Sequence, residues 1–232
     1  MLPELRWERE TLLRLAVGLF LFMAFGGVIG AEWLEPGQQW ARFLVGTASF
    51  HGAILLLVAV LMRAQGLTWA ETFGLRQGGL WRVAWIGVVT AFLALPMAWA
   101  LSWASAEMMR VFFVEPSPQQ AVTSLQASRG MMEQCSMGFM AVVVVPMAEE
   151  ILFRGLLYPI VKERTRPWLA VLSTSLVFGA IHGNLMTFVP LTVFAMVLVG
   201  LYEATGNLVA PVMAHSVFNL ANLLLLLGVG SI

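Results

Sequence analysis

The second half of the chain contains long apolar runs without a charged residue. After Arg166 no formally charged side chain occurs until Glu203, and residues 208–232 carry none. A helix needs about 20 apolar residues to cross the hydrocarbon core of a bilayer, so the stretch 167–202 can hold two such helices. These runs predict a membrane-embedded helical fold, because backbone amides at bilayer depth must bond within their own segment.

The composition supports a membrane protein and excludes several other classes. Hydrophobic residues make up 59% of the 232 residues and charged residues only 11%, whereas a soluble domain carries about 25% charged residues. With 13 basic and 13 acidic residues, the chain has no basic face for nucleic acid. The single cysteine, Cys135, allows no internal disulfide and is interpreted as a small hydrophobic residue.

Reading between the charges predicts an all-α, polytopic transmembrane bundle. We expect one integral membrane domain over residues 1–232 with about seven spans. Six or eight spans are alternatives, because Pro and Gly interrupt several segments. The first span follows Arg6, Arg9 and Arg14 and is interpreted as an uncleaved anchor, since its apolar run exceeds that of a signal peptide. The predicted spans are 15–31, 43–62, 83–106, 134–161, 167–183, 186–202 and 208–232.

The basic residues predict the orientation, because Lys and Arg accumulate on the cytoplasmic side. With the amino terminus inside, nine basic residues lie in cytoplasmic segments, against three in outer segments. We therefore expect a cytoplasmic amino terminus. The connecting segments 67–75 and 111–118 are unusually apolar. We expect segment 67–75 to lie flat at the membrane interface and segment 111–118 to dip back toward lipid. The alternative for both is an ordinary loop packed against helix ends. The cytoplasmic set is Arg6, Arg9, Arg14, Arg63, Arg76, Arg82, Lys162, Arg164 and Arg166, and the outer set is Arg42, Arg110 and Arg129.

Three ionisable residues lie inside the fourth predicted span. Each such group costs ~2.5 kcal/mol or more at bilayer depth, so it indicates function by default. Glu150 and Arg154 are four residues apart with the acid first, which favours an ion pair on one helix face. Glu149 lies about 100° around the helix and has Phe153 as its own neighbour one turn later. Glu149 therefore either needs a partner from another helix or takes up a proton.

Two more polar clusters follow on later spans. Phe178 lies one turn before His182, where its ring can pack under the imidazole, and His215 shares a helix face with Asn219. At about 1.5 Å rise per residue, Glu149 and His182 lie ~20 and ~22 Å from the same cytoplasmic hairpin and can meet. His215 lies only ~10 Å from that side, so helix tilt or an unwound segment near 206–211 has to supply the difference.

Each cluster alone also fits a structural role, as an interfacial ion-pair patch or a packed, hydrogen-bonded histidine. Three clusters on neighbouring spans favour a shared polar site instead. His51, in the second span, belongs to none of the three, and we expect it to be structural.

The ordered set of motifs resembles the glutamate intramembrane proteases of the CAAX prenyl protease and bacteriocin-processing family, also called CPBP or Abi. The three motifs are Glu149-Glu150-x-x-x-Arg154, Phe178-x-x-x-His182 and His215-x-x-x-Asn219. The resemblance covers residues 135–225, which form the predicted catalytic core.

This resemblance implies a helical bundle with a water-filled cavity, in which a peptide bond is hydrolysed within the membrane. The first glutamate would activate a water with help from the histidine of the second motif. The histidine and asparagine of the third motif would stabilise the oxyanion. The implied catalytic residues are Glu149, His182, His215 and Asn219, and the implied supporting residues are Glu150, Arg154 and Phe178.

The residue chemistry agrees, because amide hydrolysis needs a base for the water and donors for the oxyanion. No metal or cofactor is expected. A zinc-dependent membrane protease with one Glu and two His ligands, a non-catalytic membrane scaffold and a proton-coupled transporter are the alternatives. The expected partners are the lipid bilayer and a peptide or membrane-protein substrate, with no nucleic acid and with homo-oligomerisation left open. The expected location is a prokaryotic inner membrane.

Overall fold

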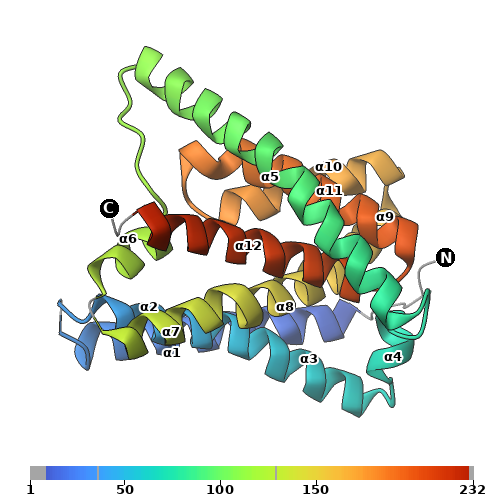
Figure 1. Ribbon diagram of the computed structural model, residues 1–232. Helices are drawn as coiled ribbons and strands as arrows, with labels where there is room; N and C mark the ends of the chain where they lie inside the picture. Colours follow the sequence, from blue (N-terminus) through green and yellow to red (C-terminus); the bar gives the residue numbers. More distant parts are fainter. Residues whose placement is uncertain (1–8, 36, 129, 230–232) are drawn as a thin grey trace.

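The computed structural model describes residues 9–35, 37–128 and 130–229 (Figure 1). Regular structure in these residues is helical throughout, without any strand. Arg6 and Arg129, which enter the predicted orientation, and residues 230–232 of the predicted last span lie outside the described residues. The α-helices are α1 (Arg9–Glu32), α2 (Gln39–Thr47), α3 (Ala53–Ala64), α4 (Trp69–Thr72), α5 (Leu80–Val111), α6 (Gln120–Ala127), α7 (Met131–Phe139), α8 (Val145–Glu150), α9 (Tyr158–Arg164), α10 (Pro167–Ile181), α11 (Leu185–Thr205) and α12 (Val209–Val229). Three π-helical segments join some of them: η1 (Ala48–Gly52), η2 (Met140–Val144) and η3 (Ile151–Leu157).

The predicted fold class is confirmed. Within the described residues, six helical segments are long and apolar enough to cross a membrane, and α10 is a seventh, shorter apolar helix. The π-helical segments do not end the spans that contain them: α2, η1 and α3 form one span, and α7 to α9 form another. The six long spans are Leu13–Glu32, Gln39–Ala64, Leu80–Val111, Met131–Arg164, Leu185–Thr205 and Val209–Gly228.

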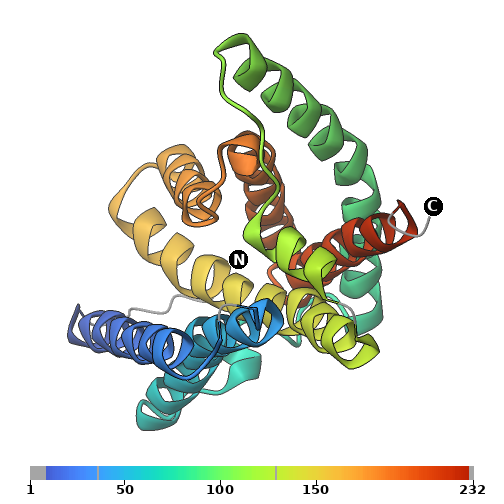
Figure 2. The ribbon, with the colours of Figure 1, turned by 90° about the vertical axis from the view of Figure 1, so that its left-hand side faces the viewer.

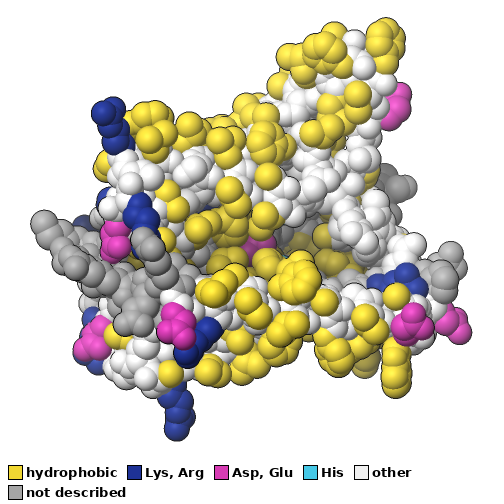
Figure 3. Space-filling view, turned by 180° about the vertical axis from the view of Figure 1, so that it is seen from behind, with side chains coloured by type: hydrophobic (Ala, Val, Ile, Leu, Met, Phe, Trp, Pro, Cys, Tyr) yellow, Lys and Arg dark blue, Asp and Glu magenta, His cyan; other side chains and the backbone are white. Residues whose placement is uncertain are grey.

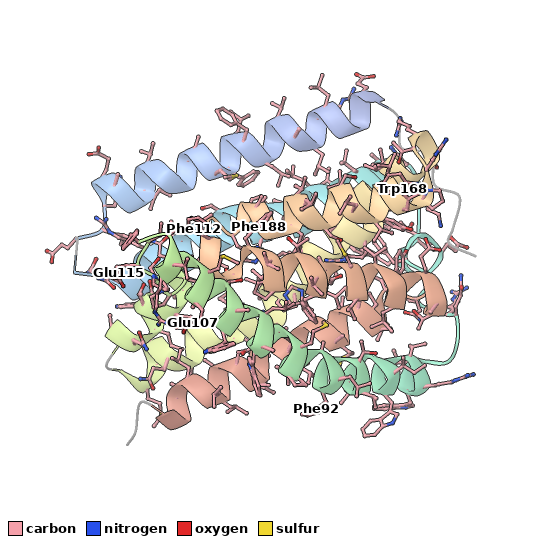
Figure 4. All side chains as sticks on the ribbon, turned by 90° about the horizontal axis from the view of Figure 1, so that it is seen from above. Phe92, Glu107, Phe112, Glu115, Trp168 and Phe188 are labelled. Carbon is pink, nitrogen blue, oxygen red and sulfur yellow. The ribbon has the colours of Figure 1, made fainter. Side chains whose placement is uncertain are left out.

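The surface has the polarity of an integral membrane protein. Figure 3 shows most charged side chains gathered at two opposite ends of the molecule, with hydrophobic side chains between them. Large apolar side chains on α1 and α5 are exposed, among them Phe20 and Trp85. Figure 4 shows Phe92 pointing away from the bundle, and places Trp168 at the end opposite to Phe112 and Glu115. These exposed apolar side chains between the two charged ends face lipid, because contact of apolar surface with water is unfavourable in free energy.

Helices α5, α11 and α12 pack together, and α8 contacts α12 on one side and η1 on the other (Figure 1). Helices α5 and α12 approach closely at Gly87, where a Cβ atom would overlap the carbonyl oxygen of Ala210. The C-terminal end of α5 extends beyond the other helices (Figure 2). After it, Phe113 is 98% exposed. The connection to α6 then returns to the bundle, where Ser117 accepts a hydrogen bond from Asn184 over 2.8 Å.

The segment between α3 and α5 packs against helix ends, as one of the two alternatives for 67–75 predicts. Phe73 is 1% exposed and packs with Tyr202 and Leu208. Its carbonyl accepts a hydrogen bond from the Leu208 amide over 3.0 Å. Asn207, which is fully buried, donates its side-chain amide to the carbonyl of Gln77 over 2.8 Å. The start of α12 is therefore covered by this segment and lies inside the protein.

Candidate active site

The two glutamates at the end of α8 are buried and face different partners. Glu150 is fully buried, and its Oε1 lies 2.8 Å from Nη1 of Arg154, which is the predicted ion pair. Arg154 is 1% exposed and also donates from Nη2 to the carbonyl of Ala195 over 3.0 Å. Its guanidinium carbon lies 4.8 Å from the centre of the Phe178 ring. The charge of Arg154 is thus fully enclosed by an acid, a carbonyl and an aromatic face.

Glu149 points away from this pair, as the helical spacing predicts, and finds its partners on other helices. It is 4% exposed. Its Oε1 lies 3.2 Å from Nε2 of His51, and its Oε2 lies 3.9 Å from Nε2 of His215. The second distance is too long for a hydrogen bond. Oε2 has no hydrogen-bond partner within the described residues, so it is the oxygen of Glu149 that remains free to react.

His215 lies beside Glu149 although its position along the chain predicts a shallower level, and the packing of the segment after α3 explains why. The estimate placed Leu208 at the membrane surface, but Leu208 is 3% exposed and bonded to the backbone of Phe73. Gly206 adopts a left-handed backbone with φ of 63°, and α12 begins only at Val209. The chain is non-helical at 206–208, as one of the two predicted alternatives requires, and the start of α12 lies inside the protein, so His215 reaches Glu149.

The three histidines share one hydrogen-bonding arrangement. Nδ1 of His51 and Nδ1 of His182 lie 3.2 and 2.7 Å from the carbonyl oxygen four residues earlier in the chain. Nδ1 of His215 lies 2.9 Å from Oε1 of Glu150. A carbonyl oxygen and an ionised carboxylate can both only accept a hydrogen bond. Each Nδ1 is therefore the donor and carries the hydrogen. In each ring, Nε2 is then the nitrogen left for other partners.

Phe178 is the common contact of the second and third motifs. It is fully buried, and its ring centre lies 5.0 Å from that of His182, as the one-turn spacing predicts. The same ring lies 5.8 Å from the ring of His215. His182 makes no direct hydrogen bond to Glu149 within the described chain, although the two groups interact electrostatically. His182 is half-buried and is more accessible than Glu149 or His215.

Asn219 lies on α12 but does not bond to the other motif residues. Its Nδ2 donates to the carbonyl oxygen of Ala141 in η2 over 2.8 Å. A side-chain amide has two N–H donors, so one donor remains for another acceptor. Its oxyanion role stays a prediction.

Each π-helical segment supplies a group to this cluster. His51 lies in η1, the carbonyl of Ala141 belongs to η2, and Arg154 lies in η3. Turns of π-helix inside α-helices are frequent at functional sites. The sequence motifs contain no indication of His51, for which we expected a structural role. The available signal was the cost of an ionisable group in a span, which applies to His51 as it does to Glu149.

Comparison with known proteins locates the resemblance in the second half of the chain. The model of the family "Type II CAAX prenyl endopeptidase Rce1-like" matches residues 132–221. The predicted family resemblance is confirmed for this segment. It contains Glu149, Glu150, Arg154, His182 and His215, whereas His51 lies outside it. Both glutamates, and the two histidines of the later motifs, therefore lie within the matched region.

A relative from Bacillus subtilis (strain 168), named "Putative membrane peptidase YdiL", is 31% identical over 77 residues. The match covers 33% of this chain and 32% of the relative, so the chain spans about a third of that protein's length. No solved structure is significantly similar to this chain.

Proposed function

We propose that this protein is an intramembrane endopeptidase in which the Glu149 carboxylate activates a water molecule. One observation carries the proposal: Glu149 is buried in the candidate span Met131–Arg164, with Oε1 bonded to an imidazole and Oε2 free beside a second imidazole. Oε2 takes a proton from the water, and the resulting hydroxide adds to the peptide carbonyl. The proton then passes to the leaving amine when the carbon–nitrogen bond breaks.

His182 is the second residue proposed to act on the water. Its Nδ1 donates to a backbone carbonyl, so Nε2 is an acceptor that can bind the water or share its proton. Because His182 is half-buried, the substrate is proposed to approach Glu149 from the side on which His182 lies.

His215 and Asn219 are proposed to bind the oxyanion of the tetrahedral intermediate. The Nδ1–H of His215 is engaged by Glu150, so donation from Nε2 requires a second proton on the ring. The Glu150 carboxylate accepts from Nδ1 of the ring and compensates that positive charge, because Glu149 already holds the proton of the water at this stage. Asn219 contributes the amide hydrogen that Ala141 does not use. Loss of one such donor typically lowers the rate by about 10²–10³-fold.

Glu150, Arg154 and Phe178 are proposed to support this machinery without touching the substrate. Arg154 holds Glu150, Glu150 holds Nδ1 of His215, and Phe178 packs against the rings or the guanidinium of three site residues. Residues 135–225 form the catalytic core of a single membrane domain over 1–232. The match to an Rce1-like model supports this assignment.

The remaining parts of the proposal concern surroundings and partners. The substrate is a peptide or a membrane protein, and it reaches the site within the bilayer. The amino terminus is cytoplasmic, and the membrane is a prokaryotic inner membrane. A polar cavity is proposed to admit water, and Figure 3 shows an acidic side chain at the bottom of a depression in the apolar surface. No cofactor is part of the proposal, and homo-oligomerisation stays open.

The direct test is cleavage of a labelled peptide library by the purified protein in lipid vesicles. The library contains prenylated and unprenylated peptides, and Glu149→Gln is the matched variant because it keeps the shape and removes the base. We expect cleavage by the wild type and none by the variant. Equal cleavage by both would contradict the glutamate mechanism, and no cleavage by either would favour a non-catalytic scaffold.

A chelator arm addresses the zinc alternative. In the part of the chain that the structure describes, no three His, Cys, Asp or Glu side chains are arranged to hold a metal ion. We expect cleavage to continue in the presence of a chelator. Inhibition that added zinc reverses would establish a zinc protease instead.

A further inference from the structure

His51 contacts the reactive glutamate from a part of the chain that carries no motif. It lies 98 positions before Glu149, in η1 of the second span, and outside the Rce1-like segment 132–221. Its Nε2 is 3.2 Å from Oε1 of Glu149. This is the shortest contact between an imidazole and Glu149 in the described residues. The assignment of His51 to a purely structural role therefore needs revision.

The hydrogen bonds of His51 determine where its protons lie. Nδ1 is 3.2 Å from the carbonyl oxygen of Thr47, which can only accept, so Nδ1 carries a hydrogen. Nε2 of a neutral ring is then an acceptor, and it faces a carboxyl oxygen, which is also an acceptor when ionised. The contact is favourable only if one proton lies between Nε2 and Oε1. His51 and Glu149 thus share one proton, which is bonded either to Nε2 of His51 or to Oε1 of Glu149.

The surroundings of His51 hold the ring in place. Its side chain is 13% exposed, so the surrounding medium has little access to the contact. The next turns of the same span are anchored in the core by Ile54 and Val58, which are 0% and 1% exposed. Segment η1 packs directly against α8, the helix that carries Glu149. An imidazole anchored in this way can fix the rotation of a neighbouring carboxylate.

We propose that His51 is a positioning residue for Glu149. By holding Oε1 and sharing its proton, it leaves Oε2 directed at the space beside His215, where the water is activated. This inference rests on the proposed function and adds a residue from the second span to the site. His51 does not touch the substrate, so its effect reaches the reaction only through the orientation of Glu149.

Three substitutions separate positioning from packing. His51→Gln places an amide donor where Nε2 lies, whereas His51→Asn reaches only the position of Nδ1, and His51→Ala removes both. We expect kcat to fall about 100-fold in His51→Ala and His51→Asn with KM nearly unchanged, because misplacing a reacting group by about 1 Å costs this much. His51→Gln is expected to recover most of the rate. Leu56→Ala, at a 53% exposed position of the same span, is the control and keeps the wild-type rate.

The kinetic result would overturn the inference if His51→Ala kept the wild-type kcat. Equal losses in His51→Gln and His51→Ala would also overturn it, because packing alone would then explain the effect. Circular dichroism of each variant in detergent identifies any that fails to fold. If another variant fails to fold, His51→Gln is compared with the wild type, because glutamine is closest to histidine in volume.

An infrared measurement tests the contact without any cleavage. The carboxyl band of Glu149 is identified as the band that disappears in Glu149→Gln. We expect this band to shift in His51→Ala and His51→Asn, and to stay close to the wild type in His51→Gln and Leu56→Ala. An unshifted band in His51→Ala would refute positioning. If the wild type cleaves nothing but the band shifts, the proposed function fails while the placement of Glu149 by His51 stands.

Discussion

Arg154 brings together an ion pair, a backbone hydrogen bond and an aromatic contact, all inside the membrane. Arg154→Leu would remove the guanidinium that neutralises the buried Glu150 and leave it with the hydrogen bond from His215. Removing one partner of a buried ion pair typically costs about 3–5 kcal/mol. We therefore expect a strongly lowered thermal unfolding midpoint for the detergent-purified variant. The exposed pair Glu10–Arg14 has the same spacing, and Arg14→Leu should lower the midpoint only slightly. Similar shifts in the two variants would show that the buried pair does not stabilise the fold.

Phe178 supports a second prediction at the residue scale. Its ring is fully buried against Arg154, His182 and His215, so Phe178→Ala opens a cavity and removes their common contact. The expected loss in the free energy of unfolding is about 3–5 kcal/mol. Phe92→Ala is the matched control, since Phe92 is 60% exposed and points outward (Figure 4). Chemical unfolding in mixed micelles measures both, and a Phe178→Ala loss no larger than that of the control would contradict the account.

At the scale of helices, the crossing of α5 and α12 depends on Gly87. A Cβ atom there would overlap the backbone oxygen of Ala210, which cannot move aside without shifting α12. Gly87→Ala should therefore destabilise the protein by about 1–3 kcal/mol. Because α12 carries His215, the same variant should also lower hydrolysis.

Gly200→Ala is the control for this crossing. Apart from its chain neighbours and the backbone of its own helix, no atom lies within 4 Å of a Cβ atom at this position in the C-terminal half of α11. Alanine is favoured over glycine in a helix by about 1 kcal/mol, so this variant should be neutral or slightly more stable. Thermal unfolding of the two variants side by side measures the difference. A destabilised Gly200→Ala with an unaffected Gly87→Ala would mean that α5 and α12 do not pack as described.

The features that were predicted from sequence are those that depend on neighbouring residues along one helix. The apolar runs located the spans, the four-residue spacing gave the pair of Glu150 with Arg154, and the same spacing placed Phe178 under His182. The depth of His215 and the partner of Asn219 depend instead on how distant segments pack. The π-helical turns shift the helix faces further, and no sequence period indicates where they occur.

His51 also shows that contacts between distant segments could not be predicted from the sequence. Its contact with Glu149 joins two spans 98 positions apart, and no motif connects them. Sequence could only mark His51 as an ionisable residue within a span, which is a general reason to suspect function. The identity of its partner required the packing of η1 against α8.

For the whole molecule, the orientation in the membrane can be tested by cysteine labelling. The natural Cys135 is exposed, so it is first replaced by Ser. Glu115→Cys and Arg166→Cys then place single thiols at exposed positions of the two opposite ends. With a cytoplasmic amino terminus, a membrane-impermeant maleimide should label residue 115 in intact cells and residue 166 only after lysis. The reverse pattern would invert the proposed orientation.

The central claim, that Glu149 activates water for peptide hydrolysis within the membrane, is tested most directly by a single turnover in ¹⁸O-labelled water. Excess wild-type protein in vesicles cleaves a limiting amount of its best peptide, and mass spectrometry reads the new carboxyl terminus. Water attack predicts one heavy oxygen in the product of the first turnover, and no product from Glu149→Gln. An unlabelled first product would mean that a protein carboxylate, and not water, supplies the new oxygen, and cleavage by Glu149→Gln at the wild-type rate would remove Glu149 from the mechanism.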